Sequence, residues 1–228
     1  MTHTNVGPLR LAVGSHKAGS GRGCAMNVIS WENGDSRISD MPDCTHPFLS
    51  RVVQRLNDSI CEHRDSDLLC ADCSVIVLGL AHRTVGTADA DPDGRVMVRI
   101  AAEEAQRVAH MNSDPRVQAA IDAALAWADT PTYADAYAAI DAARAAAAAR
   151  AAARADAYAD AGRVVADAAA YAADAAAYAD AAADAAAGRV EQTERIIDRF
   201  RALTGHDTTA PDPTVTAQAI TRMLQVTA

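Results

Sequence analysis

Apolar residues recur at the spacing of an α-helix along much of this 228-residue chain. The clearest stripe follows Pro47, which suits the first turn of a helix, while either Thr45 or His46 suits its N-cap. The stripe has members at positions i, i+3, i+4 and i+7, namely Leu49, Val52, Val53 and Leu56. This pattern predicts a helix with one buried face over residues 46–58.

Two neighbouring segments carry less regular apolar stripes. A short helix is predicted from Cys24, because Cys24, Val28 and Trp31 share a face and Gly34 stands where a left-handed C-cap belongs. A second helix is predicted to begin at Ser66 as its N-cap. Its expected apolar face is made by Leu69, Cys73, Ile76 and Leu80. The Val-Ile-Val centre of this segment also fits a buried strand, so both interpretations stay open.

Start and stop signals predict further helices toward the C-terminus. Asp114 and Pro115 are an N-cap and a first helical residue. The apolar residues that follow lie one turn apart, at Val117, Ile121 and Leu125. Residues 95–100 alternate as in a strand, but the residues after them favour a helix. An amphipathic helix is predicted between Gly188 and Gly205, and a last short helix over 212–224.

The segment 131–188 differs from the rest because it consists largely of alanine, the best helix former. We expect one long helix, or a hairpin of two antiparallel arms that turns at Gly162. Alanine faces bury little apolar area, so such a helix needs a surface to lie on. The predicted fold class is therefore all-α. Its parts are a loop or flexible arm at 1–23, a compact helical head at 24–130, the alanine-rich rod or hairpin at 131–188 and C-terminal helices at 189–228.

Charge and apolar content narrow the classes of partner. The formal net charge of −9 argues against a nucleic-acid ligand, because binding phosphates requires a basic face. No apolar run approaches the ~20 residues of a membrane span, and the first residues show no secretory signal. We therefore expect no membrane partner and a location in a bacterial cytoplasm. The five cysteines are then expected to be reduced thiols.

Cysteine and histidine residues near the middle of the head offer candidate metal ligands. Cys61 and His63 shortly precede the Cys70-x-x-Cys73 pair, and these four side chains carry the donor atoms of a tetrahedral zinc site. In a common zinc finger roughly a dozen or more residues separate the ligand pairs, whereas this spacing is shorter. Redox-active thiols, and cysteines that pack as small apolar side chains, are the alternatives.

A second group of candidate residues lies nearer the N-terminus. Its members are His16, Cys24, Asn27, Trp31, Glu32, Asp40 and Cys44. If the fold brings five of them into one pocket, they would form the polar centre of a small-molecule or catalytic site. These five are His16, Cys24, Asn27, Glu32 and Asp40. The alternative is that this stretch is a packing nucleus, which docks the first two predicted helices against each other.

Several short motifs follow one another in a specific order. They are Gly-Ser-His at 14–16, Cys-Ala-Met-Asn at 24–27, Trp31, Gly-Asp at 34–35, Asp-Met-Pro-Asp-Cys at 40–44, Asn-Asp at 57–58 and the His82 segment at 82–87. With the alanine- and tyrosine-rich half that follows, this order resembles a family of uncharacterised proteins from actinobacteria and their phages. Asn27 stands where the family pattern has Glu. The resemblance implies a provenance and an architecture, and no established activity.

These observations favour a non-enzymatic role. We expect an accessory protein of phage or prophage type that acts by protein–protein contact and modulates a host factor. Its contact surface would be the alanine-rich helix, which would bind a partner protein or a second copy of the chain. A small-molecule-binding protein or enzyme, and a small structural zinc protein, are the alternatives.

Overall fold

The computed structural model describes residues 10–14, 16, 20–61, 66–111, 114–130, 144–145 and 185–206. The helices in these residues are α1 to α5, α8 and a short 3-10 helix, with no β-sheet among them, so the predicted all-α class is confirmed. The chain divides into two compact units, Met1–Ala90 with Ala186–Ala228, and Asp91–Ala185. Among the described helices, none combines the length and the apolar character needed to span a membrane.

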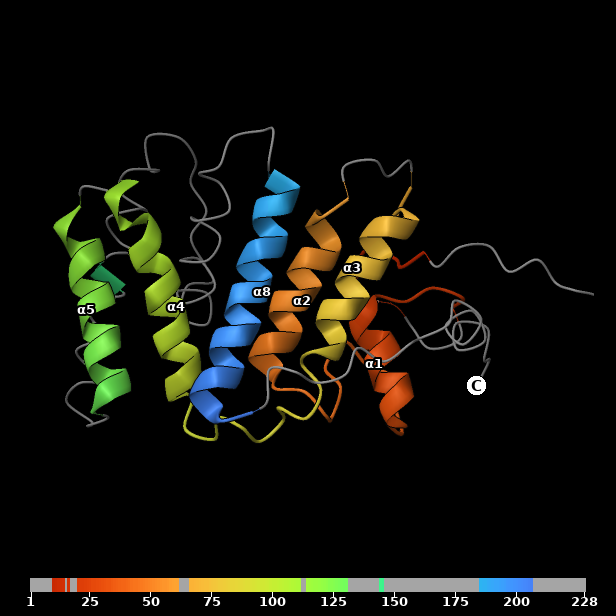
Figure 1. The fold of residues 1–228 in the computed structure, drawn as a ribbon, viewed down its shortest axis with the longest axis horizontal. Helices are drawn as coiled ribbons and strands as arrows, with labels where there is room; N and C mark the ends of the chain where they lie inside the picture. The colour runs from red at the N-terminus through yellow and green to blue at the C-terminus, as the bar shows by residue number, and fades with distance from the viewer. Residues whose placement is uncertain are drawn as a thin grey trace, which may run out of the picture. The chain divides into compact units, whose positions relative to one another are not determined.

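The first unit contains four described helices. They are α1 (Ala25–Asn33), α2 (Pro47–Ser59), α3 (Ala71–His82) and α8 (Ala185–Thr204). The helices α1, α2 and α3 all pack against one another, and α8 lies beside α2 (Figure 1). The core between them includes Met26, Ile29, Leu49, Val53, Leu69, Val77, Ile197 and Phe200.

Local signals decide where α1 and α2 begin and end. Gly34 adopts φ 76°, a left-handed conformation that favours glycine, and ends α1 as predicted. Pro47 opens α2, and Nδ1 of the His46 cap accepts a hydrogen bond from the backbone amide of Phe48 at 3.3 Å. Both predicted helices are therefore confirmed, and His46 is the cap of α2.

The predicted start of α3 at Ser66 is wrong, because the helix begins at Ala71 with Cys70 as its N-cap. The backbone before Cys70 is held in a long-range pairing instead. Leu69 donates its amide hydrogen to the carbonyl of Leu11 at 2.8 Å, and Ala12 forms an antiparallel bridge with Leu68. The predicted face also differs, since Ile76 is 43% exposed. The side that α3 buries includes Ser74, Val77, Leu80 and Ala81.

The described part of the N-terminal segment is a loop packed into the core. Leu11 and Ala12 are completely buried. The side-chain amide of Asn57 donates to the carbonyl of Ala12 at 2.8 Å, and Asp58 accepts from the amide of Gly14 at 2.9 Å. This segment thus contributes apolar side chains to the same core as α2 and α3.

The helix α8 belongs to the first unit although it begins at Ala185, far along the chain from Ala90, where the first part of that unit ends. The ring of Phe200 is completely buried, with its centroid 5.0 Å from that of His46 and 6.4 Å from that of Phe48. The buried Arg201 donates to the carbonyl of Arg83 at 2.6 Å. The amphipathic helix predicted before Gly205 is confirmed, and it begins three residues before Gly188, at Ala185.

The second unit is built from α4 (Arg95–Val108), the 3-10 helix η1 (Ala109–Met111) and α5 (Pro115–Asp129). The helical alternative for the strand-like residues at 95–100 is therefore correct. Asp114 caps α5 by accepting from the amide of Arg116 at 2.9 Å, as its position before Pro115 predicts. The apolar contact between α4 and α5 is made by Ala102, Ala105 and Ile121, with Val117, Ala124 and Leu125 around them.

Two predictions fall on residues outside the described ranges. The alanine-rich rod or hairpin is described only at Arg144 and Ala145, both helical, and from 185 onward. Gly162 and the short helix predicted over 212–224 lie outside the described residues.

Candidate metal centre

Three of the four predicted zinc ligands come together in the structure. Cys61 follows Ile60, the C-cap of α2, while Cys70 is the N-cap of α3 and Cys73 lies in its first turn. The sulfur atoms of Cys61, Cys70 and Cys73 all lie within 4.8 Å of one another. His63, the fourth predicted ligand, lies outside the described residues.

The start of α3 supplies two of the three cysteines of this cluster. Leu69 pairs with Leu11, and the helix begins directly after Cys70, which is its N-cap, while Cys73 lies in its first turn. The amide of Cys70 donates to the sulfur of Cys61 at 3.3 Å, which ties the end of α2 to the start of α3. Two helix ends and the packed N-terminal segment thus position the three sulfurs.

The three thiols differ in their electrostatic surroundings. The backbone amide of Cys73, followed by the Cys73 thiol, lowers the pKa of Cys70 against a weaker effect of burial. Burial, followed by the hydrogen bonds that the Cys73 thiol donates to the sulfurs of Cys70 and Cys61, raises the pKa of Cys73 to about 12. Cys61 is only 6% exposed, whereas the other two are partly exposed. The cluster therefore pairs one thiol whose pKa is lowered with one whose pKa is raised.

The donor set fits a thiophilic metal ion. In a tetrahedral site with Zn–S bonds of about 2.3 Å, neighbouring sulfurs lie about 3.8 Å apart. Since the three sulfurs are already within 4.8 Å of one another, small side-chain rotations bring them to that spacing. The cluster of Cys61, Cys70 and Cys73 could hold a metal ion.

The remaining two cysteines lie outside this cluster. Cys24, the N-cap of α1, is buried, and this burial raises the pKa of its thiol to about 11. Cys44 is partly buried, and burial followed by the charge of Asp35 raises its pKa. The carbonyl of Cys44 accepts from the amide of Gly86 at 2.8 Å, so its backbone joins the loop before α2 to the loop after α3.

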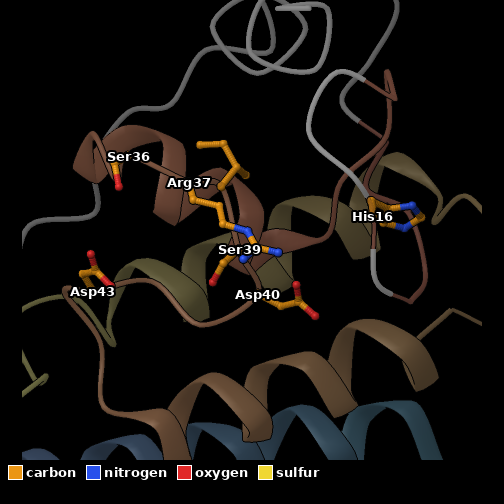
Figure 2. A pocket seen from close by; sticks show the side chains of 7 residues that line it. His16, Ser36, Arg37, Ser39, Asp40 and Asp43 are labelled. Carbon is orange, nitrogen blue, oxygen red and sulfur yellow. The ribbon is translucent and has the colours of Figure 1, made fainter. Parts of the chain in front are cut away.

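The structure brings only two of the predicted small-molecule site residues to a common hollow. This hollow has a volume of about 610 Å³ and is lined by His16, Ser36, Arg37, Ile38, Ser39, Asp40 and Asp43. Figure 2 shows His16 on the side opposite Ser36 and Asp43, with Asp40 between them. Nε2 of His16 lies 3.0 Å from the carbonyl oxygen of Val13.

The other members of that set have structural partners elsewhere. Asn27 is buried, and its side-chain oxygen accepts from the amide of Cys24 at 3.1 Å, which makes it the N3 partner of a capping box. Its Nδ2 is buried and has no hydrogen-bond partner among the described residues. A Glu at this position would also supply the accepting oxygen, so helix capping accounts for both residues.

Trp31 and Glu32 lie at the end of α1. Trp31 is half-buried, and its carbonyl accepts from the amide of Gly34 at 3.0 Å. The carboxylate of Glu32 lies 2.7 Å from Nε2 of the buried His82, which joins α1 to α3. Trp31 and Glu32 therefore have structural partners, one at the end of α1 and the other on α3.

Asp35 organises the loop between α1 and α2. Its carboxylate accepts from the hydroxyl of Ser30 at 2.7 Å, from the side-chain amide of Asn33 and from the backbone amide of Asp43 at 3.2 Å. Burial opposes ionisation here, but these hydrogen bonds outweigh it and lower the pKa of Asp35. The Gly-Asp pair after Trp31 is the sequence signal that marks this turn.

Comparisons with protein-family models, with curated proteins and with solved structures found no match to this chain.

Proposed function

We propose that this protein binds a zinc ion through the thiolates of Cys61, Cys70 and Cys73. The observation that carries the proposal is the approach of the three sulfurs to within 4.8 Å of one another. Thiolate ligands favour zinc over magnesium or calcium, which take oxygen donors. Three of the five cysteines of the chain therefore lie together in the first unit.

The role of the ion would be structural. Cys61 ends the α2 segment and Cys70 begins α3, so a shared metal cross-links the two helix ends. Such a link stabilises the folded state by the free energy of binding, because the unfolded chain does not present the ligands together. The sequence prediction adds His63 as the fourth ligand.

Metal analysis of the reduced full-length chain tests the proposal. We expect one zinc per chain, and a loss of zinc in the single variants Cys61→Ser, Cys70→Ser and Cys73→Ser. Cys44→Ser is the matched control, because Cys44 is also partly exposed but stands outside the cluster. A His63→Ala variant tests the fourth ligand separately and should weaken binding without abolishing it. A wild-type chain that takes up no zinc, or zinc that remains in all three cysteine variants, would contradict the proposal.

A second candidate function is protein–protein contact, as expected for an accessory protein that acts on a host factor. The observation that favours it is a pair of exposed apolar side chains on α3, Val75 at 62% and Ile76 at 43% exposure. A contiguous exposed apolar patch marks a surface that another protein covers, and these two consecutive residues would form part of such a patch. The alanine-rich segment remains the predicted contact helix, and most of it lies outside the described residues.

Sedimentation equilibrium of the full chain tests the self-association form of this second function. We expect an oligomer that weakens in the double variant Val75→Ser/Ile76→Ser. The control is Val85→Ser, which alters an apolar side chain that is 40% exposed but lies in the loop after α3. A monomer at every concentration would rule out self-association, and equal weakening by the control would remove the α3 pair from the contact.

A further inference from the structure

The Cys70-x-x-Cys73 pair has the arrangement of a reactive dithiol. Residues three apart in the first turn of a helix are surface neighbours, and both sulfurs belong to the cluster within 4.8 Å. Both side chains are partly exposed, whereas Cys61 is 6% exposed. A small oxidant in solution therefore meets Cys70 and Cys73 before it meets Cys61.

The position of Cys70 also favours attack by its sulfur. As the N-cap of α3 it faces the first turn, where backbone N–H groups have no carbonyl partner within the helix. The positive end of the helix dipole stabilises negative charge at this place. Cys73 lies one turn further along, where it can displace a group attached to Cys70.

We propose that Cys70 and Cys73 exchange with low-molecular-weight disulfides, and that the resulting Cys70–Cys73 disulfide releases the metal ion. In the first step the Cys70 sulfur attacks one sulfur of a disulfide RSSR, forming a mixed Cys70–SR disulfide and expelling RS⁻. In the second step the Cys73 sulfur, having given up its proton to solvent, attacks the Cys70 sulfur, forms the protein disulfide and expels a second RS⁻. Both leaving thiolates take up protons, so the protein loses two hydrogens and RSSR becomes two RSH.

Loss of the metal follows from the ligand count. A disulfide sulfur has no negative charge to donate, so oxidation leaves Cys61 as the single thiolate of the three. This consequence rests on the proposed zinc function, whereas the exchange reaction rests only on the placement of the two thiols. The metal site would then respond to the thiol–disulfide balance of its surroundings.

The test treats the full-length protein with oxidised glutathione, in metal-free and zinc-loaded form, and maps disulfides by alkylation and peptide mass. We expect the metal-free chain to lose two thiols to a Cys70–Cys73 disulfide. In Cys73→Ser a glutathione should remain attached to Cys70, because the second step is blocked. Cys61→Ser and Cys44→Ser should still form the disulfide, and Cys70→Ser should not. Zinc-loaded protein should release its ion in step with disulfide formation.

Each contrary outcome identifies what has failed. A disulfide that includes Cys61, no reaction in the metal-free chain, or no trapped glutathione in Cys73→Ser would overturn the exchange. If the protein undergoes the exchange but binds no zinc, the zinc proposal and the proposed release of the ion are both wrong. The exchange proposal is supported by the same result. If zinc stays bound while the Cys70–Cys73 disulfide forms, only the proposed release of the ion is wrong.

Discussion

The side-chain amide of Asn57 donates to the carbonyl of Ala12 at 2.8 Å across 45 residues of sequence. The side-chain oxygen of the same residue accepts from the amide of Ala25 at 3.3 Å. Asn57 is 1% exposed and therefore satisfies two buried backbone groups from different segments. The Asn-Asp motif at 57–58 thus acts as a structural connector between α2, the N-terminal segment and the start of α1.

Replacing Asn57 by Ala should destabilise the protein strongly. Both backbone partners would stay buried without a hydrogen bond, which costs about 2–3 kcal/mol of unfolding free energy. Urea unfolding of the full chain measures this loss. Ser59→Ala is the control, since Ser59 lies on the same helix but is exposed. Equal stability of the two variants would show that the connector role of Asn57 is wrong.

Replacing Phe200 by Ala should detach α8 from the first unit or loosen it. The ring is completely buried against His46 and Phe48, and removal of a buried Phe typically costs about 3–5 kcal/mol. Hydrogen exchange should show lower protection along α8, and Phe200→Leu should restore part of it. Exchange rates along α8 that match those of the wild type would contradict this packing.

The contribution of Asp35 to stability should depend on pH. Its pKa is lowered in the folded protein, so the contribution is present at neutral pH and is lost as the pH falls through the folded value. Asp35→Asn should therefore reduce the unfolding free energy at neutral pH, by about 1 kcal/mol for the lost charge-assisted bonds of a mostly solvated group. The difference from wild type should shrink in strong acid.

The matched control for Asp35 is Asp43→Asn. Asp43 is exposed on the same loop and takes part in the Asp35 network through its backbone amide, which this substitution keeps. A constant difference between wild type and Asp35→Asn at every pH would show that the carboxylate charge is not what stabilises the loop.

Zinc affinity should rise with pH. Free Cys73 has a pKa raised to about 12, so it must release its proton when it binds the ion. Each proton released makes the affinity rise by up to about tenfold per pH unit. Competition with a chromophoric chelator at several pH values measures this slope. An affinity that does not change between weakly acidic and weakly alkaline buffer would mean that Cys73 is not a ligand.

The sequence by itself determined the helices whose ends are marked locally. The His46–Pro47 and Asp114–Pro115 starts and the Gly34 and Gly205 ends depend on backbone conformation and on hydrogen bonds within a few residues. Helical periodicity likewise identified the buried stripe of α2, because a residue's face on a helix follows from its position alone.

Only the tertiary structure decided which segments meet. Leu69 pairs with Leu11 directly before α3, and the sulfurs of Cys70 and Cys73 at the start of that helix lie beside the sulfur of Cys61. No local pattern encodes that pairing, because its energy comes from backbone groups and apolar side chains far apart in the chain. The same reason explains why Leu11 is buried in a segment without periodicity. It also explains why Ile76 is exposed, since the segments packed against α3 decide which of its faces is buried.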